Sequence, residues 1–177
     1  MERTHSKPPF QIKKTDTVSI ISHIRPEGDS IGSTLALGLA LHKICDNVHM
    51  YFNDQIPKKY CFLPGINEIQ TYNMETNQYT DFCFVLDCGD TERLGYSDII
   101  LNNTHKIVNI DHHITNTNFG DINIIDFDAS STCEIIFALL NDIGISVDDS
   151  IATCLYTGIV TDTGNFIYDN TTPKTNK

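Results

Sequence analysis

Short, nearly continuous apolar runs alternate along the chain with longer segments whose apolar residues recur every three or four positions. Runs of the first kind predict buried strands, and segments of the second kind predict helices. We expect strands at residues 17–23, 48–52, 81–90, 106–113 and 121–126. We expect helices at residues 31–45 and 130–144, and a third from about residue 148 to a break between 158 and 164. Residues 53–65 contain Pro57, Pro64 and Gly65 and predict a loop with a helical turn at most.

This alternation predicts an α/β fold, with a mostly parallel sheet flanked by helices on both faces. The length of 177 residues fits one domain. Hydrophobic residues make up 40% of the chain and charged residues 20%, which is typical of a globular protein. The six cysteines form no C-x-x-C pair, so we interpret them as small buried hydrophobic residues in a reducing compartment.

Charge and hydropathy narrow the expected partners and location. No apolar run approaches the roughly 20 residues that span a bilayer, so no membrane contact is expected. The first residues lack the apolar segment of a secretion signal, which favours a cytoplasmic protein. The net charge of −11 would repel long nucleic acid. A set of carboxylates that binds divalent cations would account for part of this charge.

Acids and histidines gather where the predicted strands end. They are His23, Glu27 and Asp29; Asp87 and Asp90; Asp111, His112 and His113; and Asp162. Taken singly, each group also fits a polar loop, a turn or a helix cap. Taken together, they are expected at one edge of the sheet, where ligands gather in such folds. Four carboxylates there would repel one another unless a cation neutralised them.

We therefore predict a site for two divalent metal ions. Mixed carboxylate and imidazole ligands suit Mn²⁺ best, and Mg²⁺, Zn²⁺ and Fe²⁺ are also compatible. Two such ions are the usual arrangement for attack on a phosphoester. Gly32 and Ser33 are expected at a helix N-terminus, where backbone N–H groups bind phosphate. Arg25 either approaches a phosphate or is solvated in its loop, and Asp90 is interpreted as a turn residue.

Four segments resemble, in order, the four motifs of the DHH phosphoesterases. They are "SHIRPEGDSIGS", "VLDCGD", "NIDHH" and "TGIVTDTGNF". The similarity runs from about Val18 to the end of the chain and favours the nanoRNase and pAp phosphatase branch. The resemblance implies that residues 1–177 form the catalytic, metal-binding DHH domain. It also implies hydrolysis of short oligoribonucleotides and of 3′-phosphoadenosine 5′-phosphate (pAp).

The resemblance also implies a role for each motif residue. His23, Glu27 and Asp87 would hold one metal ion, and Asp29, Asp87, His112 and Asp162 the other, with Asp87 shared. His113 would face the scissile phosphate, and Asp111 would orient a histidine. Glu27 stands where the family usually has an aspartate, which moves its carboxylate one methylene further out.

Family enzymes continue into a second, substrate-gripping domain with a glycine-rich motif that contains histidine. At the C-terminus, Thr172 and Pro173 predict the start of a helix that has four residues left to run. We therefore expect the chain to be a fragment, or a gene product that lacks the second domain. A homodimer is left open. The alternatives are a pyrophosphatase or cyclic-dinucleotide phosphodiesterase of the same family, and a non-catalytic metal- or nucleotide-binding module.

Overall fold

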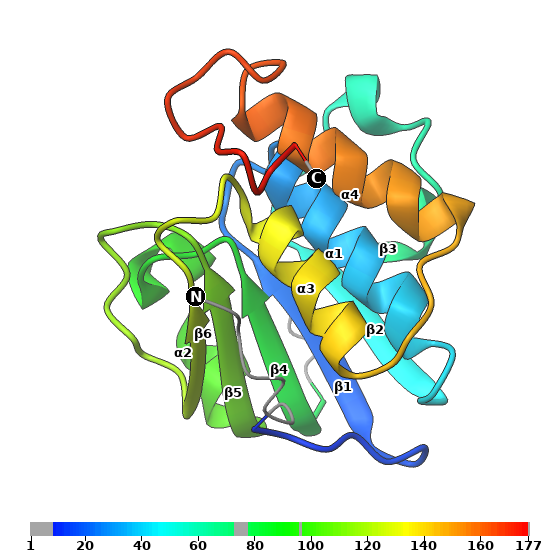
Figure 1. Ribbon diagram of the computed structural model, residues 1–177. Coiled ribbons are helices and arrows are strands. Elements are labelled where there is room, and N and C mark those ends of the chain that lie inside the picture. Colours follow the sequence, from blue (N-terminus) through cyan, green and yellow to red (C-terminus); the bar gives the residue numbers. More distant parts are fainter. Residues whose placement is uncertain (1–8, 73–77, 96, 177) are drawn as a thin grey trace.

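A six-stranded parallel sheet forms the centre of the protein, as a computed structural model shows it (Figure 1). The structure describes residues 9–72, 78–95 and 97–176. The strands are β1 Thr17–Ser22, β2 Asn47–Phe52, β3 Ile69–Thr71, β4 Thr80–Leu86, β5 Thr104–Asp111 and β6 Ile122–Ile125. Their order across the sheet is β3-β2-β1-β4-β5-β6, and all neighbouring pairs are parallel. The expected α/β fold with a parallel sheet is confirmed.

Helices cover the two faces of this sheet unequally. The helices are α1 Gly28–Leu41, α2 Ser97–Asn102, α3 Thr132–Asp142 and α4 Asp149–Asp162. In Figure 1, α1, α3 and α4 lie side by side on one face, while α2 lies on the other. Short 3₁₀ turns occur at Lys58–Tyr60, Ile66–Glu68 and Thr91–Leu94. None of the described helices is both long and apolar enough to cross a membrane.

The apolar strands explain why both faces are covered. Successive side chains along a strand point to opposite faces, so a continuous apolar run presents hydrophobic residues to each. On β1, Ile20 belongs to the core beneath α1, α3 and α4, whereas its neighbour Ile21 belongs to the smaller core on the α2 side. On β4, Phe84 and Val85 divide in the same way. All four side chains are at most 3% exposed.

Most of the expected elements occur, with shifted ends. The helix expected at residues 31–45 begins earlier, at Gly28, because the Ser30 hydroxyl accepts the Glu27 N–H at 2.9 Å and closes the first turn. Gly144 lies two residues after the end of α3 in a left-handed conformation, as expected for a glycine that ends a helix. The pattern missed β3 and α2, which are too short to show periodicity. Five of the six cysteines are buried, and Cys61 is exposed.

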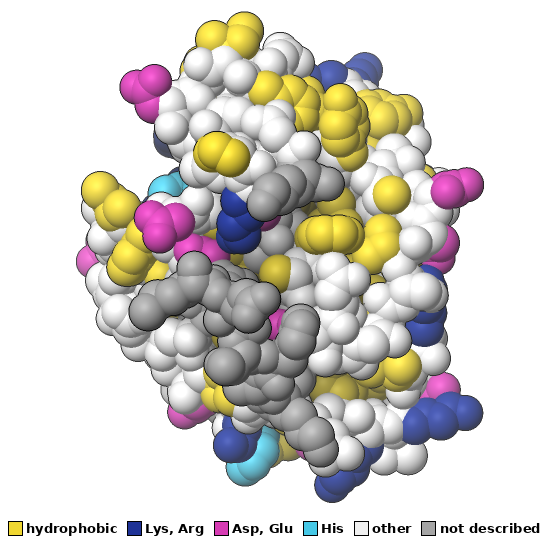
Figure 2. All heavy atoms as spheres, viewed as in Figure 1, with side chains coloured by type: hydrophobic (Ala, Val, Ile, Leu, Met, Phe, Trp, Pro, Cys, Tyr) yellow, Lys and Arg dark blue, Asp and Glu magenta, His cyan; other side chains and the backbone are white. Residues whose placement is uncertain are grey.

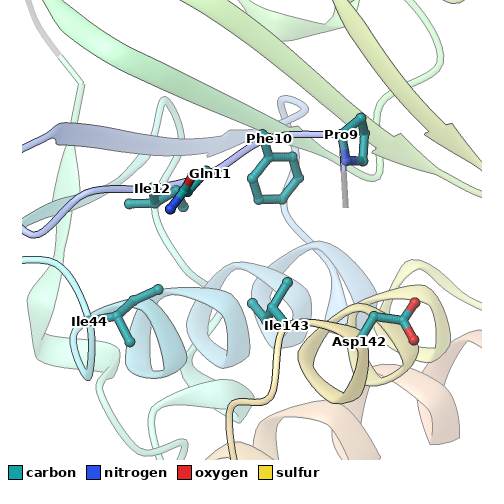
Figure 3. Close-up of a pocket in the computed structure, with 7 residues that line it drawn as sticks. All are labelled: Pro9, Phe10, Gln11, Ile12, Ile44, Asp142 and Ile143. Atoms are coloured by element: carbon teal, nitrogen blue, oxygen red, sulfur yellow. The ribbon is translucent and has the colours of Figure 1, made fainter. Parts of the chain in front are cut away.

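The N-terminal segment crosses the end of the sheet that lies furthest from the start of α1. Phe10 packs edge-on against Phe84, with ring centroids 5.3 Å apart. Together with Ile12, Ile44 and Ile143 it lines a hollow of about 680 Å³ (Figure 3). This hollow lies past the last turns of α1 and α3 and contains none of the predicted site residues.

Candidate active site

The predicted site residues meet at the carboxyl ends of β1, β4 and β5. After β1 the chain adds β2 and β3 on one side, then returns to place β4 on the other, so the strand order reverses between β1 and β4. Crevices at such switch points are where parallel α/β sheets bind ligands. Asp87 directly follows β4 and has a φ of 54°, a left-handed conformation that is uncommon outside glycine, although aspartate adopts it more readily than most residues. Strain of this kind is characteristic of functional positions.

His112 lies among three carboxylates. Its Nε2 atom is 3.4 Å from an oxygen of Asp162, 3.8 Å from Oδ1 of Asp87 and 3.9 Å from an oxygen of Asp29. This buried nitrogen has no hydrogen-bond partner among the described residues. The other ring nitrogen, Nδ1, faces the Ala129 carbonyl at 3.3 Å. A proton on Nδ1 leaves a lone pair on Nε2, which is the tautomer of a metal ligand.

His23 faces Asp87 from the opposite side. Its Nε2 is 3.4 Å from Oδ2 of Asp87 and 3.9 Å from Oε1 of Glu27. The His23 Nδ1 lies 2.6 Å from the Ile24 carbonyl, so Nε2 is again the free nitrogen. The side chain of His23 is 2% exposed and that of Glu27 is 69% exposed, so Glu27 stands at the rim. The two oxygens of Asp87 thus face two different histidines.

Asp111 is surrounded by hydrogen-bond donors and does not face the other carboxylates directly. Its Oδ1 accepts from Nδ1 of His113 at 2.7 Å and from the His112 backbone N–H at 2.9 Å. Its Oδ2 accepts from the Asn116 amide at 2.7 Å. Asn116 is itself held by Oδ1 of Asn109 at 2.8 Å. This network fixes the direction in which the His113 ring points, and Nδ1 of His113 lies 3.7 Å from Oδ1 of Asp87.

The N-terminus of α3 binds Asp29 across a long sequence separation. The backbone N–H groups of Thr132 and Cys133 donate to the two carboxylate oxygens at 2.7 and 2.9 Å. The Thr132 hydroxyl also donates to Oδ1 of Asp87 at 3.3 Å. A helix N-terminus carries unpaired N–H groups and a partial positive charge, so it stabilises a carboxylate there. Asp29 and α1 are thereby tied to α3.

Burial and mutual repulsion dominate the electrostatics of these acids. Burial, followed by the charge of Asp29, raises the pKa of Asp87 well above its usual range. The same two causes raise the pKa of Asp162 to about 6. The hydrogen bond to Asp111 raises the pKa of His113 to about 8. Burial works against ionisation of Asp111 too, but hydrogen bonds from His113 and Asn116 more than offset it and lower its pKa. A cation between Asp29, Asp87 and Asp162 would remove the repulsion.

The donor set fits divalent cations. Two groups of three residues each bring ligand atoms within 4.8 Å of one another; they are Asp87, His112 and His113, and Asp29, His112 and Asp162. Carboxylate oxygens and neutral imidazole nitrogens suit Mn²⁺, Mg²⁺, Zn²⁺ and Fe²⁺. The unpaired Nε2 of His112 and the crowded carboxylates are both features that a bound cation would satisfy.

The expectation that Gly32 and Ser33 lie at a helix N-terminus is wrong. Because α1 begins at Gly28, both residues lie in its second turn, where backbone N–H groups are used by the helix itself. Ser33 is fully buried, and its hydroxyl donates to the Asp29 carbonyl at 2.7 Å. A Cβ added at Gly32 would lie 2.5 Å from the Cys154 carbonyl oxygen, so this glycine permits close contact between α1 and α4. Neither residue is available to a phosphate.

Two further expectations concern polar loop residues. Arg25 is exposed and has a left-handed φ of 60°, and its backbone N–H donates to Asp54 at 2.6 Å. Asp90 accepts from the Arg93 backbone N–H at 3.1 Å and caps a 3₁₀ turn, which agrees with its interpretation as a turn residue. Near the C-terminus, the Thr172 hydroxyl accepts from the N–H groups of Lys174 and Thr175 in a turn, at 3.2 and 3.3 Å.

The residues that hold Asp29 and Asp111 in position were not predicted from the sequence. Asn116 binds Asp111 and is itself held by Asn109, and Thr132 and Cys133 bind Asp29. Asn109 offered a signal, since it is a polar residue that interrupts the apolar run at residues 107–110 of β5. The role of Thr132 and Cys133 had no local signal, because their contact is made through the backbone.

Comparisons with known proteins show which family and relatives the chain resembles. The model of the DHH family, N-terminal domain, matches residues 17–159. A bifunctional oligoribonuclease and PAP phosphatase NrnA from Thermus thermophilus is 32% identical over 157 residues, which are 89% of this chain and 46% of that protein. The protein of the same name from Bacillus subtilis is 28% identical over 165 residues, covering 92% and 51%. The chain spans about half the length of the curated relatives that it matches.

Solved structures show the same fold. An exopolyphosphatase-related protein from Bacteroides fragilis superposes with a TM-score of 0.84 and 31% identity, over 91% of this chain and 50% of that one. A putative family II inorganic pyrophosphatase from Methanococcus jannaschii has a TM-score of 0.66 and 20% identity, over 90% and 53%. The second likeness concerns the fold alone.

Proposed function

Because the chain belongs to the DHH family, we propose that it is the metal-binding part of a phosphohydrolase that cleaves short oligoribonucleotides and pAp. The observation that carries this proposal is the buried, unpaired Nε2 of His112, which faces the carboxylates of Asp29, Asp87 and Asp162 within 3.9 Å. The names of the relatives support the substrate class. Two divalent ions, with Mn²⁺ as the best fit to the ligands, are part of the proposal.

We assign the ligands as the resemblance to the family implies. His23, Glu27 and Asp87 would hold one ion, and Asp29, Asp87, His112 and Asp162 the other. In support, the Asp87 oxygens face His23 and His112 separately, so one carboxylate can serve both ions. Bound divalent ions would supply charge neutralisation and an activated water for attack on phosphorus. The protein's own contribution is to fix these ligands in a strained, buried crevice before substrate arrives.

His113 is assigned to the scissile phosphate. Its Nδ1 donates to Asp111, and this hydrogen bond raises the pKa of the ring to about 8 in the metal-free protein, which favours its protonated form. The second proton, on Nε2, is then available for donation to a phosphate oxygen. Asp111 acts as a positioning residue because donors already surround both of its oxygens.

The test is hydrolysis of a dinucleotide and of pAp with Mn²⁺ present, by this chain and by its Asp87→Asn variant. Asp46→Asn is the matched control, because Asp46 is exposed and only pairs with Lys14 at 3.8 Å. We expect turnover in the wild type and the control, and its loss in Asp87→Asn. Wild-type rates in Asp87→Asn would refute the proposal.

The same assay separates the alternatives. Hydrolysis of pyrophosphate or of a cyclic dinucleotide in preference to pAp would assign another reaction of the family. Tight metal binding without turnover of any of these substrates would favour the non-catalytic binding module.

A further inference from the structure

A polar groove leads away from the acidic cluster. Its volume is about 390 Å³, within the range of pockets that hold small ligands. We call it the Tyr168 groove; its lining residues include Asp29, Asp162, Lys59, Tyr60, Gly164 and Tyr168. It starts at three proposed metal ligands, Glu27, Asp29 and Asp162, and continues between the 3₁₀ turn at Lys58–Tyr60 and the segment that follows α4. In Figure 1 that segment, coloured red, lies beyond the end of α4.

The ring of Tyr168 is exposed but held in place. The side chain is 60% exposed, and the ring lies so close to Gly164 that an added Cβ would be 2.4 Å from its Cζ atom. Gly164, Asn165 and Phe166 have successive φ values of 57°, 60° and 63°. The buried Thr163 supports this left-handed turn, since its carbonyl accepts the N–H groups of Ile167 and Tyr168, each at 3.0 Å.

Such a turn is unfavourable for side-chain-bearing residues and persists only where its surroundings enforce it. Here it directs an exposed aromatic ring to the mouth of a groove that begins at the proposed metal ligands. Exposed aromatic rings beside phosphate-binding sites are typical stacking platforms for nucleic acid bases.

Lys59 supplies positive charge on the opposite wall. It is the one cation among the described residues that line the groove. The other charged residues of the lining are Glu27, Asp29 and Asp162. Its Nζ lies 4.8 Å from the centroid of the Tyr60 ring, and Tyr60 is buried. A cation over an aromatic face is held by the ring's charge distribution, so the position of Lys59 is restrained. It lies outside the acidic cluster and is available to a second phosphate.

Two other hollows contain none of the proposed metal ligands. The groove along α4, which includes Phe62, Tyr156 and Val160, is apolar, and hydrophobic side chains gather over this part of the molecule in Figure 2. No occupant can be argued for it. The hollow beneath Phe10 lies at the other end of the sheet.

We propose that the Tyr168 groove is a nucleotide subsite, in which Tyr168 stacks on a base and Lys59 pairs with a phosphate other than the one being hydrolysed. The proposal rests on the proposed function and names the part of this chain that recognises the substrate's nucleotide. Such a subsite would favour short nucleotides that carry a second phosphate over simple phosphate esters.

The test is binding of a dinucleotide that carries 2-aminopurine, with Mn²⁺ present, because 2-aminopurine fluorescence is quenched on stacking. We compare the wild-type chain with Tyr168→Leu and Tyr168→Phe. We expect Tyr168→Leu to lose the quench and to bind about 10-fold or more weakly. Tyr168→Phe retains a stacking ring, so it should retain both the fluorescence quench and the affinity of the wild type. Tyr156→Leu is the matched control, since Tyr156 is equally exposed at 61% but lines the α4 groove.

Lys59 is tested with pAp and with adenosine 5′-monophosphate, which lacks the second phosphate. Lys59→Gln should weaken pAp binding several-fold, reduce its salt dependence and leave adenosine 5′-monophosphate binding nearly unchanged. Lys58→Gln is the control from the same turn, because Lys58 is exposed and is not among the groove residues. An unchanged quench and affinity in Tyr168→Leu, or equal effects of the Lys58 and Lys59 variants, would overturn the subsite.

Failure of the subsite can be told apart from failure of the proposed function. Hydrolysis of bis(p-nitrophenyl) phosphate, which has no base, is compared in the wild type and in Asp87→Asn. If Asp87→Asn abolishes that hydrolysis while Tyr168→Leu still quenches 2-aminopurine, the subsite is wrong and the function stands. If no hydrolysis occurs but the quench depends on Tyr168, the subsite stands in a binding module.

Discussion

His113 donates from Nδ1 to Oδ1 of Asp111 over 2.7 Å, and Asp111 is entirely buried. The same carboxylate accepts the Asn116 amide at 2.7 Å through its other oxygen. In the proposed site, Asp111 would therefore act through the histidine that it orients, and Asn116 through Asp111.

Asn116→Ala is expected to impair positioning. It leaves an oxygen of Asp111 and one of Asn109 without their amide partner in a buried setting, which costs about 1–3 kcal/mol of stability. The His113 ring then loses its fixed orientation, so kcat should fall while KM for pAp changes little. Urea denaturation and steady-state kinetics measure the two effects. Asn141→Ala, an exposed position on α3, is the control, and a similar fall in kcat there would argue against positioning.

Asp87→Asn is expected to change thermal stability in opposite directions with and without metal. In the metal-free protein it removes a buried charge that burial and Asp29 disfavour, so Tm should rise. In the wild type, Mn²⁺ at about 100 times its Kd should add about 2.7 kcal/mol, a Tm increase of roughly 5–10 °C. That increase should largely vanish in Asp87→Asn and remain in Asp46→Asn. Calorimetry with Mn²⁺ and with a chelator measures these changes in Tm.

Gly32→Ala is expected to destabilise the protein through packing. The added Cβ would lie 2.5 Å from the Cys154 carbonyl, so α1 and α4 must move apart. Overpacking of this kind lowers the free energy of unfolding by about 1–3 kcal/mol. At Gly89 the nearest atom to an added Cβ is 3.5 Å away, so Gly89→Ala is the control in chemical denaturation. Equal stability of the Gly32→Ala variant and the wild type would show that the helices tolerate the contact.

Glu134 is expected to contribute a pH-dependent part of the stability. Burial opposes its ionisation, but the ion pair with Lys174 at 2.7 Å and the Ser130 hydrogen bonds outweigh this and lower its pKa below 4.5. A carboxyl group whose pKa is lower in the folded state stabilises the fold above its unfolded pKa. That contribution is lost as pH falls from about 4.5 through the folded pKa.

Glu134→Gln should therefore be less stable than the wild type at pH 7, and the difference should shrink as pH falls from 5 to 3. Urea midpoints across this range measure it. Glu92→Gln, an exposed side chain in a 3₁₀ turn, controls for the change in net charge. A difference that stays constant with pH would assign the loss to hydrogen bonding alone.

The alternation of apolar runs was enough to predict the α/β fold, because a strand that is buried on both faces must be apolar at every position. The same patterns located the ends of β1, β4 and β5, and therefore the edge at which His23, Asp87 and His112 would meet. The resemblance of four segments to the family's motifs implied the metal ligands, whose assignment remains a proposal. The extent of α1 was not predicted, since its first turn depends on the contact between Glu27 and Ser30.

The tertiary structure alone decided which groups hold the site together. Asp29 is bound by Thr132, 103 residues further along, through a backbone N–H that any residue other than proline carries. Gly32 was expected to bind phosphate at a helix N-terminus, yet it lies inside α1 and permits close helix contact, because Cys154 lies against it. The periodicity of apolar residues predicts which face of a helix or strand is buried. It does not predict which atom of a distant element lies opposite that face. That partner is determined only when the helices have packed on the sheet.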